Sequence, residues 1–313
     1  MNKPLIVIVG PTAVGKSGAA LLVARELNGE IISADSMQVY KHMDLGTAKP
    51  TQEEMRMVKH HLVDIVHPWQ EFSVADFQRL AKSCITEIQG RGRLPIVVGG
   101  TGLYINSLVY NLNFADTVSD PELRTYLGSL ARERGNQYLY EMLKRIDPDS
   151  ALKLHANDIR RIIRAIEVYH CTGKPMSVQR DDAKERKLPY QPVIFGLKME
   201  RDRLYKKIEQ RVDKMIAGGL VDEVKDLLER GCKREMVSMQ GLGYKEIIGC
   251  LEGDYSLDDA IELLKRNTRR FAKRQFTWFK RDDRIIWVDV DRIGNSDDIA
   301  NTIIEHIRFK LSI

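Results

Sequence analysis

Three short runs of apolar residues stand out in the first hundred residues, and each ends in glycine or in a polar turn. They are PLIVIVG at 4–10, GEIISAD at 29–35 and RLPIVVGGTG at 93–102. Between these runs, the segments 15–27 and 73–92 repeat their apolar residues near the helical period. Continuous apolar strands that alternate with helices are typical of a parallel sheet covered on both faces. The pattern therefore predicts an α/β fold.

The pattern changes between residues 118 and 189. This stretch shows no convincing strand and predicts several helices, interrupted at Gly135, Pro148 and Gly173. Strands return with YQPVIFGLKM at 190–199 and RIIWVDVD at 284–291. We therefore predict a catalytic core of residues 1–117 and 190–313, with an all-helical domain of residues 118–189 inserted into it. The helices expected between residues 201 and 281 could belong to either domain.

Composition and cysteine use narrow the class of protein. Apolar residues make up 43% and charged residues 30% of the 313 residues, as in ordinary globular proteins. No apolar run approaches the ~18 residues of a membrane span, and none of the four cysteines forms a C-x-x-C pair. We expect a monomeric cytoplasmic protein with no membrane partner and no zinc site. The adjacent His60 and His61 could bind metal, but neighbouring side chains diverge on regular elements, which favours a structural role.

The first apolar run leads directly into GPTAVGKS at residues 10–17, which fits the phosphate-binding pattern G-x-x-x-x-G-K-[ST]. Gly10 and Gly15 allow backbone N–H groups to converge on phosphate oxygens, at the positive end of the following helix. Lys16 would neutralise the outer phosphate charge, and Ser17 could hold Mg²⁺. Strand, loop and helix in this order predict a core like that of P-loop NTPases. Such loops usually hold ATP, and the phosphate could be transferred, hydrolysed or released as a leaving group.

A hydrolytic NTPase usually carries an acidic residue at the end of another buried strand to order Mg²⁺. The third apolar run ends instead in Gly99, Gly100 and Thr101, and the acidic residue is Asp35, at the end of the second run. Because strand ends line the ligand crevice of a parallel sheet, Asp35 is expected to face the phosphate loop and act on an acceptor. Asp35 could alternatively be a turn aspartate, and the glycines at 99, 100 and 102 could allow close approach of a ligand or form a plain turn.

Positive charge is concentrated in two segments, although the net charge is only +5. One is NDIRRIIRAIE, and the other is the stretch 265–284, in which Phe271, Phe276, Trp278 and Phe279 alternate with basic residues. A charge run is usually a solvated face, but aromatic rings among arginines favour stacking with bases. The segment SMQGLGYKE at 238–246 offers polar and aromatic groups at a bend, or is simply a turn between helices. Together these features indicate a phosphate-bearing donor and a nucleic-acid acceptor.

A set of motifs in a fixed order now supports a family resemblance. The motifs are GPTAVGKS, SADSMQVYK, GTAKPT, HHLVDI, VGGTGLYI, RRIIRAIEVYHCTGKP, GLGYKE and KRQFTWFKR. Spanning residues 10 to about 281, they resemble those of bacterial tRNA dimethylallyltransferases, also called isopentenyltransferases. Some eukaryotic members carry a C-terminal zinc finger, and this sequence ends without one, which favours the bacterial type. The resemblance implies transfer of a dimethylallyl group from dimethylallyl diphosphate to N6 of the adenosine 3′ to the anticodon, in tRNAs reading codons that start with U.

The resemblance assigns catalysis to Asp35, Thr12, Lys16 and Thr101. Asp35 is the candidate base, because the N6 lone pair is delocalised into the purine and a proton must leave as the new bond forms. Thr12 matches a family position near the reacting centre, and Thr101 matches one that contacts the tRNA nucleotide. Mg²⁺ on Ser17 would share the charge of the departing diphosphate. The residues expected to bind the diphosphate are Gly10, Pro11, Thr12, Ala13, Val14, Gly15, Lys16, Ser17 and Arg164.

The resemblance also implies a surface for the tRNA anticodon stem-loop. Ser36, Met37 and Gln38 follow the base and would hold the adenine, which must leave its stack to react. Trp278 could contact RNA or face the core. The residues expected to bind tRNA are Asp35, Ser36, Met37, Gln38, Thr101, Arg160, Arg161, Gln240, Gly243, Tyr244, Lys245, Lys273, Arg274, Gln275, Trp278, Lys280 and Arg281.

Two other functions fit parts of the sequence. A small-molecule or nucleotide kinase would explain the phosphate loop and Asp35, but not the basic and aromatic stretch 265–284. A nucleotide-dependent RNA-binding protein without catalytic activity would explain the basic residues, but would leave Asp35 without a role.

Overall fold

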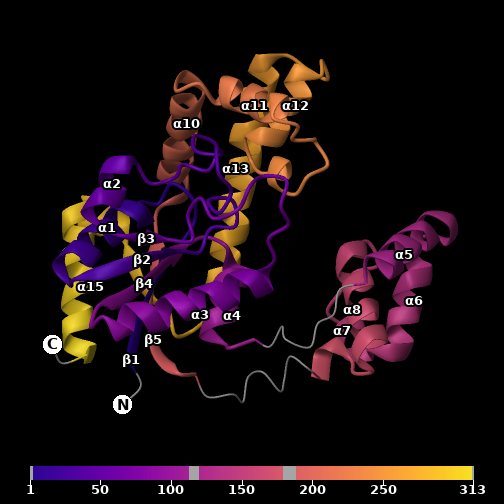
Figure 1. Ribbon diagram of the computed structural model, residues 1–313, viewed down its shortest axis with the longest axis horizontal. Coiled ribbons are helices and arrows are strands. Elements are labelled where there is room, and N and C mark those ends of the chain that lie inside the picture. The colour runs from indigo at the N-terminus through magenta and orange to yellow at the C-terminus, as the bar shows by residue number, and fades with distance from the viewer. Residues whose placement is uncertain (1–2, 113–119, 179–187, 312–313) are drawn as a thin grey trace. The chain divides into compact units, whose positions relative to one another are not determined.

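The computed structural model describes residues 3–112, 120–178 and 188–311 (Figure 1). The chain forms two compact units, one from residues 1–105 and 189–313 and the other from residues 106–188. The sequence predicts the first boundary after residue 117, whereas the division falls inside α4 (Gly102–Val109). The helices between residues 201 and 281, whose assignment the sequence leaves open, lie in the first unit.

A six-stranded parallel sheet forms the centre of the first unit, in the order β3-β2-β4-β1-β5-β6. Its strands are β1 (Lys3–Val9), β2 (Gly29–Ser33), β3 (His60–His61), β4 (Leu94–Gly99), β5 (Tyr190–Lys198) and β6 (Ile286–Asp289). The apolar runs of the sequence supply β1, β2, β4 and β5, which are almost wholly buried. The predicted α/β class with a parallel sheet is confirmed.

The order of the strands determines where the first helices lie. The chain crosses from β1 through α1 (Lys16–Glu26) to β2, and then returns from β3 through α3 (Val74–Gly90) to β4. Right-handed crossovers in opposite directions place their helices on opposite faces of a sheet, and Figure 1 shows α1 and α3 on opposite sides. The last helix, α15 (Ser296–Leu311), packs beside α1. Both faces of the sheet are thus covered near the phosphate loop.

A second apolar core lies beyond the carboxyl ends of the strands. It joins α11 (Leu220–Glu229), the short helix η1 (Ser238–Gln240) and α12 (Tyr244–Leu251) to Val39 and Met43, which follow β2. The long helices α10 (Arg201–Ala217) and α13 (Leu257–Phe279) pack against each other and extend between this core and the sheet. The short helices α2 (Gln52–Met57) and α14 (Val290–Ile293) complete the unit. This second core therefore positions the segment that follows Asp35.

All regular secondary structure in the described residues of the second unit is helical. Its elements are α5 (Pro121–Arg134), α6 (Asn136–Ile146), α7 (Pro148–Ala151) and α8 (Ile159–Thr172). Leu127, Leu139, Leu143 and Ile162 form its buried core. The all-helical insertion predicted from the sequence is confirmed as a fold class.

The two adjacent histidines form the edge strand β3, which the sequence does not predict. The His60 ring bonds the carbonyl of Val58, and His61 Nε2 lies 2.7 Å from a carboxylate oxygen of buried Glu30. Burial opposes ionisation of Glu30, but hydrogen bonds from His61 and Arg91 hold its pKa at about 2. These contacts fasten β3 to β2. None of the helices in the described ranges combines the length and apolar character needed to cross a membrane.

Candidate active site

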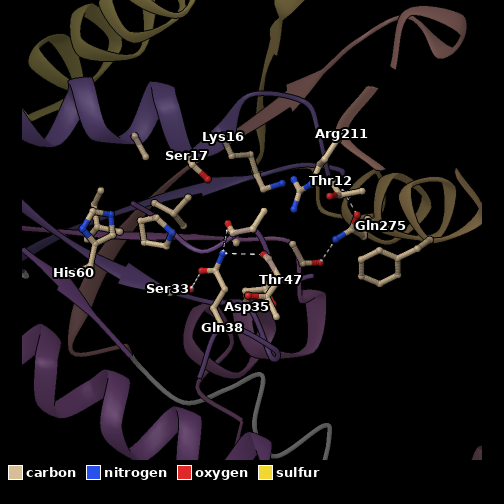
Figure 2. Close-up of a pocket in the computed structure, with 18 residues that line it drawn as sticks. Thr12, Lys16, Ser17, Ser33, Asp35, Gln38, Thr47, His60, Arg211 and Gln275 are labelled. Carbon is tan, nitrogen blue, oxygen red and sulfur yellow. Dashed lines mark hydrogen bonds between the residues drawn. The ribbon is translucent and has the colours of Figure 1, made fainter. Parts of the chain in front are cut away.

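The carboxyl ends of β2, β4 and β1 are adjacent in the sheet and open into one pocket (Figure 2). Parallel strands bring all their carboxyl ends to the same edge, so the residues that follow them meet there. The pocket is lined by Thr12, Lys16, Ser17, Ala20, Ile31, Ser33, Asp35, Gln38, Thr47, Ala48, Pro50, His60, Val98, Gly99, Gly100, Arg211, Phe271 and Gln275. The phosphate loop and Asp35 therefore face one pocket, as predicted from the order of the strands.

The phosphate loop owes its shape to three residues with positive φ. Gly15, at the start of α1, has φ 100°, and Ala13 has φ 65°. Gly10 has φ 149°, and a Cβ there would lie 2.7 Å from the carbonyl oxygen of Leu197 in β5. Gly15 is thus needed for its backbone conformation, whereas Gly10 is needed for conformation and space. The loop directs the amino end of α1 toward the pocket, where partial positive charge favours an anion.

Two cations, Lys16 and Arg211, lie on the side of the pocket formed by the phosphate loop. We call this the donor side, because the sequence predicts that a phosphate-bearing donor binds there. Lys16 Nζ donates a hydrogen bond to the carbonyl of Pro11 at 2.7 Å. Burial, together with the charge of Arg211, lowers the pKa of Lys16 to about 7, and the charge of Asp35 partly opposes the shift. Burial also lowers the pKa of Arg211, with Asp35 again opposing. Both cations lack a carboxylate partner among the ion pairs of the described residues, so an anionic ligand would stabilise their charged forms.

Arg211 is a site residue that the sequence analysis missed. It lies on α10 together with buried Leu204, Ile208 and Val212. The signal was present in the sequence: an arginine seven residues after Leu204 and three after Ile208 falls on the face that the apolar period predicts to be buried. A cation at such a position needs an anionic partner, because an unpaired buried charge is costly.

Asp35 combines the two roles that the sequence leaves open. Its Oδ1 accepts a hydrogen bond from the N–H of Met37 at 2.9 Å, which is a turn contact. The same carboxylate lines the pocket opposite the phosphate loop. Thr101 Oγ1 accepts from the N–H of Ser36 at 3.1 Å and lies 3.4 Å from Ser36 Oγ. Thr101 and the residues after Asp35 are thus neighbours at one side of the pocket.

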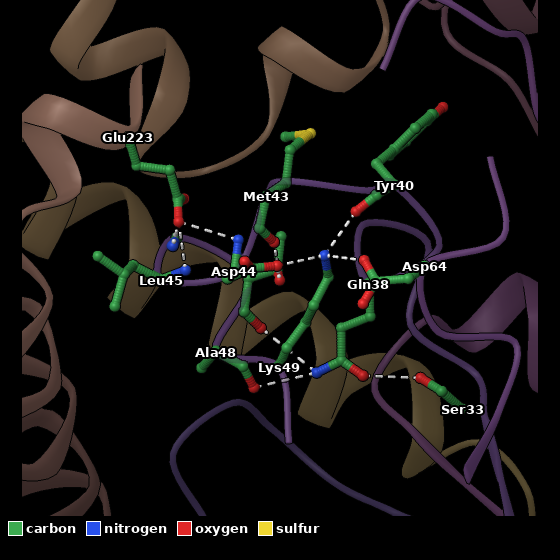
Figure 3. Close-up of polar contacts among 12 residues, drawn as sticks. Ser33, Gln38, Tyr40, Met43, Asp44, Leu45, Ala48, Lys49, Asp64 and Glu223 are labelled. Atoms are coloured by element: carbon green, nitrogen blue, oxygen red, sulfur yellow. Dashed lines mark hydrogen bonds and ion pairs between the residues drawn. The ribbon is translucent and has the colours of Figure 1, made fainter. Parts of the chain in front are cut away.

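Gln38 lines the pocket, and its side-chain amide is hydrogen-bonded at both ends (Figure 3). Its Oε1 accepts from Ser33 Oγ at 2.8 Å, and its Nε2 donates to the carbonyl of Ala48 at 3.1 Å and that of Thr47 at 3.4 Å. Backbone carbonyls can only accept, so they fix the orientation of the amide. Both ends of the Gln38 amide are therefore bonded to protein groups, and the contact of Gln38 with the adenine, which the resemblance implies, stays a prediction.

The segment from Tyr40 to Lys49 is held by two charged side chains (Figure 3). Lys49 Nζ donates to the carbonyl of Tyr40 at 2.6 Å and bonds the carboxylates of Asp44 and Asp64. From α11, the Glu223 carboxylate accepts from the N–H groups of residues 44, 45 and 46 and from the hydroxyl of Tyr244. Thr47 and Ala48 of this segment line the pocket. The part of the pocket wall formed by Thr47 and Ala48 therefore depends on Glu223, a residue far away in the sequence, as well as on Lys49.

Protein atoms occupy the space beside Gly99, the last residue of β4, and beside the two glycines that follow it. Gly99 and Gly100 also line the pocket, so the close approach of a ligand to their backbone stays a prediction. A Cβ at Gly99 would lie 2.2 Å from the carbonyl oxygen of Ala34, and one at Gly100 would lie 2.1 Å from Gln275 Nε2. At Gly102, a Cβ would lie 2.4 Å from the Trp278 ring. The end of β4 thus packs closely against Ala34, which follows β2, and the segment after β4 packs against α13.

Comparisons with known proteins show what this fold and pocket resemble. The family model for "IPP transferase" matches residues 38–282, and that for "Isopentenyl transferase" matches residues 3–67. The chain belongs to the IPP transferase family. The tRNA dimethylallyltransferases of Acetivibrio thermocellus and Carboxydothermus hydrogenoformans are 51% and 56% identical to it, over 96% and 92% of this chain and 96% and 93% of their own.

Two solved structures extend the similarity of this IPP transferase. A tRNA isopentenylpyrophosphate transferase from Bacillus halodurans has a TM-score of 0.74 and 47% identity, covering 100% of this chain and 97% of its own. A eukaryotic dimethylallyltransferase described as acting on tRNA has a TM-score of 0.83 and 30% identity, covering 99% of this chain and 80% of its own. The family resemblance inferred from the motifs is confirmed.

Three predicted tRNA-binding residues of this IPP transferase are buried. Tyr244 has no exposed surface and donates its hydroxyl hydrogen to Glu223 at 2.6 Å, so its ring is not available for stacking. Gly243 is also buried, with φ 95°, beside Leu220. Gln275 is 6% exposed, and its amide bonds backbone groups of Thr12 and Gly100. Tyr244 and Gln275 contact other parts of the protein through hydrogen bonds and are too buried to touch tRNA. The expectation that these two residues bind tRNA is therefore corrected.

Other predicted tRNA-binding residues are accessible. Gln240, Lys273, Arg274, Lys280 and Arg281 are exposed, and Lys245 is half-buried. Other basic residues of α13 are engaged: Lys265 pairs with Asp213, and Arg269 pairs with Glu209. Trp278 is 37% exposed and packs against Gly102. Part of its ring is therefore buried against the protein, and part is accessible to solvent. The basic stretch therefore contains two kinds of cation: those paired with carboxylates of the protein, and exposed ones that could contact RNA phosphates.

The arginines of the helical unit differ in exposure. Arg160 and Arg161 are exposed on α8, with Arg161 Nη1 3.9 Å from the carboxylate of Asp158, whereas Arg164 Nη1 lies 2.5 Å from the buried carboxylate of Glu167. Arg124 bonds the same carboxylate, and together with the N–H of Asp120 these partners hold the pKa of Glu167 below its usual value although burial opposes ionisation. The proposed contact of Arg164 with the diphosphate stays a prediction.

Proposed function

We propose that this chain transfers a dimethylallyl group from dimethylallyl diphosphate to N6 of the adenosine that follows the anticodon, in tRNAs reading codons that start with U. Curated relatives similar over nearly the whole chain are tRNA dimethylallyltransferases, which supports this assignment. The single observation that carries it is the pocket itself: Lys16 and Arg211 lie on one side of it, and Asp35 lies opposite. Cations suit a leaving diphosphate, and the carboxylate suits a proton-losing acceptor.

The donor diphosphate binds at the phosphate loop. The N–H groups of residues 13–17 are the available donors, because Pro11 has no N–H and the N–H of Thr12 is bonded to Gln275 at 2.8 Å. Lys16 and Arg211 add positive charge where negative charge develops as the C1–O bond breaks. The backbone of Pro11 and Thr12 then shapes the loop rather than donating to the ligand, while the Thr12 side chain lines the pocket and remains a candidate near the reacting centre.

Magnesium fits the donor side only with help from the ligand. Ser17 opens into the pocket, and the only group of His, Cys, Asp and Glu side chains close enough to hold a metal within the described ranges is Asp120, His170 and Cys171, in the other unit. Mg²⁺ usually keeps several waters and binds through substrate phosphates. Ser17 would hold the ion together with the diphosphate oxygens, and the bound ion would neutralise charge on the leaving group.

The chemical step forms one bond and breaks one. The N6 amine of adenine attacks C1 of the donor, the C1–O bond breaks, and diphosphate leaves with the bonding electrons. Asp35 accepts the proton that N6 loses, since a neutral amine conjugated to the purine is a weak nucleophile. Thr101, beside Ser36, lies where it would position the nucleotide. The adenine leaves its stack to reach this pocket.

The exposed cations of α13 supply a surface for the tRNA phosphates. Lys273 and Arg274 are exposed and have no carboxylate partner among the ion pairs of the described ranges, and the guanidinium of Arg274 lies 5.8 Å from the centre of the Phe271 ring. Phosphate contacts of this kind give affinity without reading sequence. We propose that the enzyme acts as a monomer, in the cytoplasm where tRNA is used.

A prenylation assay with labelled dimethylallyl diphosphate and unmodified tRNA tests this proposal. We expect label in N6-dimethylallyladenosine at the nucleotide 3′ to the anticodon, with one diphosphate released per group transferred. A tRNA with another base at that position serves as the control. Absence of transfer to unmodified tRNA would refute the proposal, and phosphorylation of a small molecule from ATP would support a kinase instead.

A further inference from the structure

Gln275 occupies an unusual place for a residue of the basic stretch. It lies on α13 directly after the exposed Lys273 and Arg274, yet it is 6% exposed and points into the pocket (Figure 2). Its neighbours on the same face, Ala272 and Phe279, are buried apolar residues. A buried amide among apolar neighbours is costly unless both its ends are hydrogen-bonded. The contacts of this side chain therefore decide what it does.

Both ends of the Gln275 amide are bonded to backbone groups of the site. Oε1 accepts from the N–H of Thr12 at 2.8 Å, and Nε2 donates to the carbonyl of Gly100 at 3.0 Å. An N–H can only donate and a carbonyl can only accept, so the amide has one permitted orientation. The side chain thus links the phosphate loop after β1 to the turn after β4.

The absence of a side chain at Gly100 allows the Gln275 amide to lie where it does. A Cβ at residue 100 would lie 2.1 Å from Gln275 Nε2, which is closer than non-bonded atoms can approach. The next atoms from that Cβ position are Gln275 Cδ at 3.2 Å and the carbonyl oxygen of Gly10 at 3.5 Å. The amide of Gln275 therefore fills the space that a side chain at residue 100 would need.

We infer that Gln275 is a positioning residue for the transfer reaction: it fixes the distance between Thr12 on the donor side and Gly100–Thr101 on the acceptor side. This inference rests on the proposed function. Because reacting groups must be aligned to well under 1 Å, a small change in this distance lowers the rate of the chemical step. Donor and tRNA binding depend on other groups, namely the N–H groups of residues 13–17, Lys16, Arg211 and the exposed cations, so binding should change little.

Three substitutions test the inference. Gln275→Met keeps the volume but removes both hydrogen bonds, Gln275→Glu keeps the acceptor for Thr12 and loses the donor to Gly100, and Gly100→Ala displaces the amide. Gln52→Met, an exposed residue at the start of α2, is the matched control. For each protein we would measure the single-turnover rate at saturating substrates, inhibition by inorganic pyrophosphate, affinity for an anticodon stem-loop RNA, and thermal unfolding.

We expect single-turnover rates 10- to 100-fold lower for Gln275→Met, following the cost of misplacement, with pyrophosphate inhibition and RNA affinity within about twofold of the parent by the same argument. Gln275→Glu should retain more activity than Gln275→Met. Unchanged rates in folded Gln275→Met and Gly100→Ala proteins would overturn the inference. So would a loss confined to RNA affinity, because Gln275 would then be an RNA contact.

A double-mutant cycle separates positioning from a general loss of stability. If Gly100 serves the Gln275 amide, Gly100→Ala should slow the parent strongly but should slow a Gln275→Ala protein much less, because Gln275→Ala vacates the space. Additive effects on the rate would contradict the inference. A parent enzyme that transfers no dimethylallyl group would refute the proposed function, and this inference with it, whereas an active parent with additive variants refutes the inference alone.

Discussion

The donor and acceptor sides of the pocket are built in different ways. On the donor side, one continuous motif supplies the backbone shape and Lys16, and α10 adds a single cation, Arg211. On the acceptor side, Asp35 begins a segment whose conformation depends on Glu223, more than 170 residues away, and on Lys49. A motif can therefore specify a phosphate site almost alone, whereas the acceptor wall requires the fold of the whole unit.

The largest expected effect is the loss of turnover when the candidate base on the acceptor side, Asp35, is replaced. Asp35→Asn keeps the shape and the turn contact with Met37, but the amide cannot accept the proton from N6. A general base contributes about 10²–10⁴ in rate, so turnover should fall by that factor while tRNA affinity and thermal unfolding stay near the parent. Steady-state kinetics at saturating tRNA give the comparison. A variant within a few-fold of the parent would remove Asp35 from the mechanism.

Loss of the donor-side cation should come next. Lys16→Met removes the charge that faces the leaving diphosphate and should lower kcat by about 10²–10³, the range seen when one preorganised charge-stabilising donor is lost. Inhibition by inorganic pyrophosphate should weaken, while RNA affinity should stay the same. If pyrophosphate inhibits parent and variant equally, the loop is not the donor site.

The pH dependence of donor binding should also depend on Lys16. Burial lowers the pKa of this side chain to about 7, and only the protonated form attracts an anion. Pyrophosphate affinity should therefore fall as pH rises above about 7, by up to about tenfold per unit for one obligatory proton. The titration of pyrophosphate itself is the same for all proteins, so Lys16→Met is the control and should show a shallower slope. Parallel slopes would contradict the role of Lys16.

A smaller effect should follow from loosening the acceptor wall. Glu223→Ala leaves the N–H groups of residues 44–46 and the hydroxyl of Tyr244 without their acceptor. Tyr244 is buried, and an unsatisfied buried group costs about 1–3 kcal/mol, so the unfolding temperature should fall and the KM for tRNA should rise. Pyrophosphate inhibition should be unaffected, since the donor side does not contain Glu223. If Glu223→Ala changed pyrophosphate inhibition and left the KM for tRNA unchanged, the assignment of this wall to the acceptor side would be wrong.

The smallest expected effect concerns the exposed cations of α13. Lys273→Ala with Arg274→Ala should weaken tRNA binding, because each lost phosphate contact reduces the salt slope of log K by roughly 0.7–0.9. Affinity at several salt concentrations measures this slope, and Lys265→Ala, which breaks an ion pair with Asp213, is the control. Equal slopes in folded proteins would show that Lys273 and Arg274 form only a solvated face.

How much of this site the sequence predicts depends on the distance over which its contacts act. The strands, the phosphate loop and the placement of Asp35 follow from local apolar patterns and from the rule that parallel strands end together. The role of Gln275 does not, because its partners at Thr12 and Gly100 lie 263 and 175 residues away. Tyr244 was misjudged for a related reason: a tyrosine near two glycines indicates an exposed bend, but the core formed with Val39 and Met43 buries it.

The glycines show the same limit. Gly15 was correctly interpreted, since a phosphate loop needs positive φ, and the structure has φ 100° there with open space around it. For Gly100 and Gly102 the sequence leaves open a ligand or a plain turn, whereas in the structure Gln275 and Trp278 occupy the space beside them. A sequence shows that a glycine is present but not what approaches it, because the neighbour comes from another part of the chain.

The most direct test of the account is the fate of the phosphates during turnover. With dimethylallyl diphosphate and unmodified tRNA, we predict one diphosphate released for each N6-dimethylallyladenosine formed, no orthophosphate, and no requirement for ATP. Products would be quantified together from one reaction by chromatography and a pyrophosphate assay. Consumption of ATP coupled to modification, or modified adenosine formed without stoichiometric diphosphate, would contradict the claim that this phosphate loop holds a leaving group.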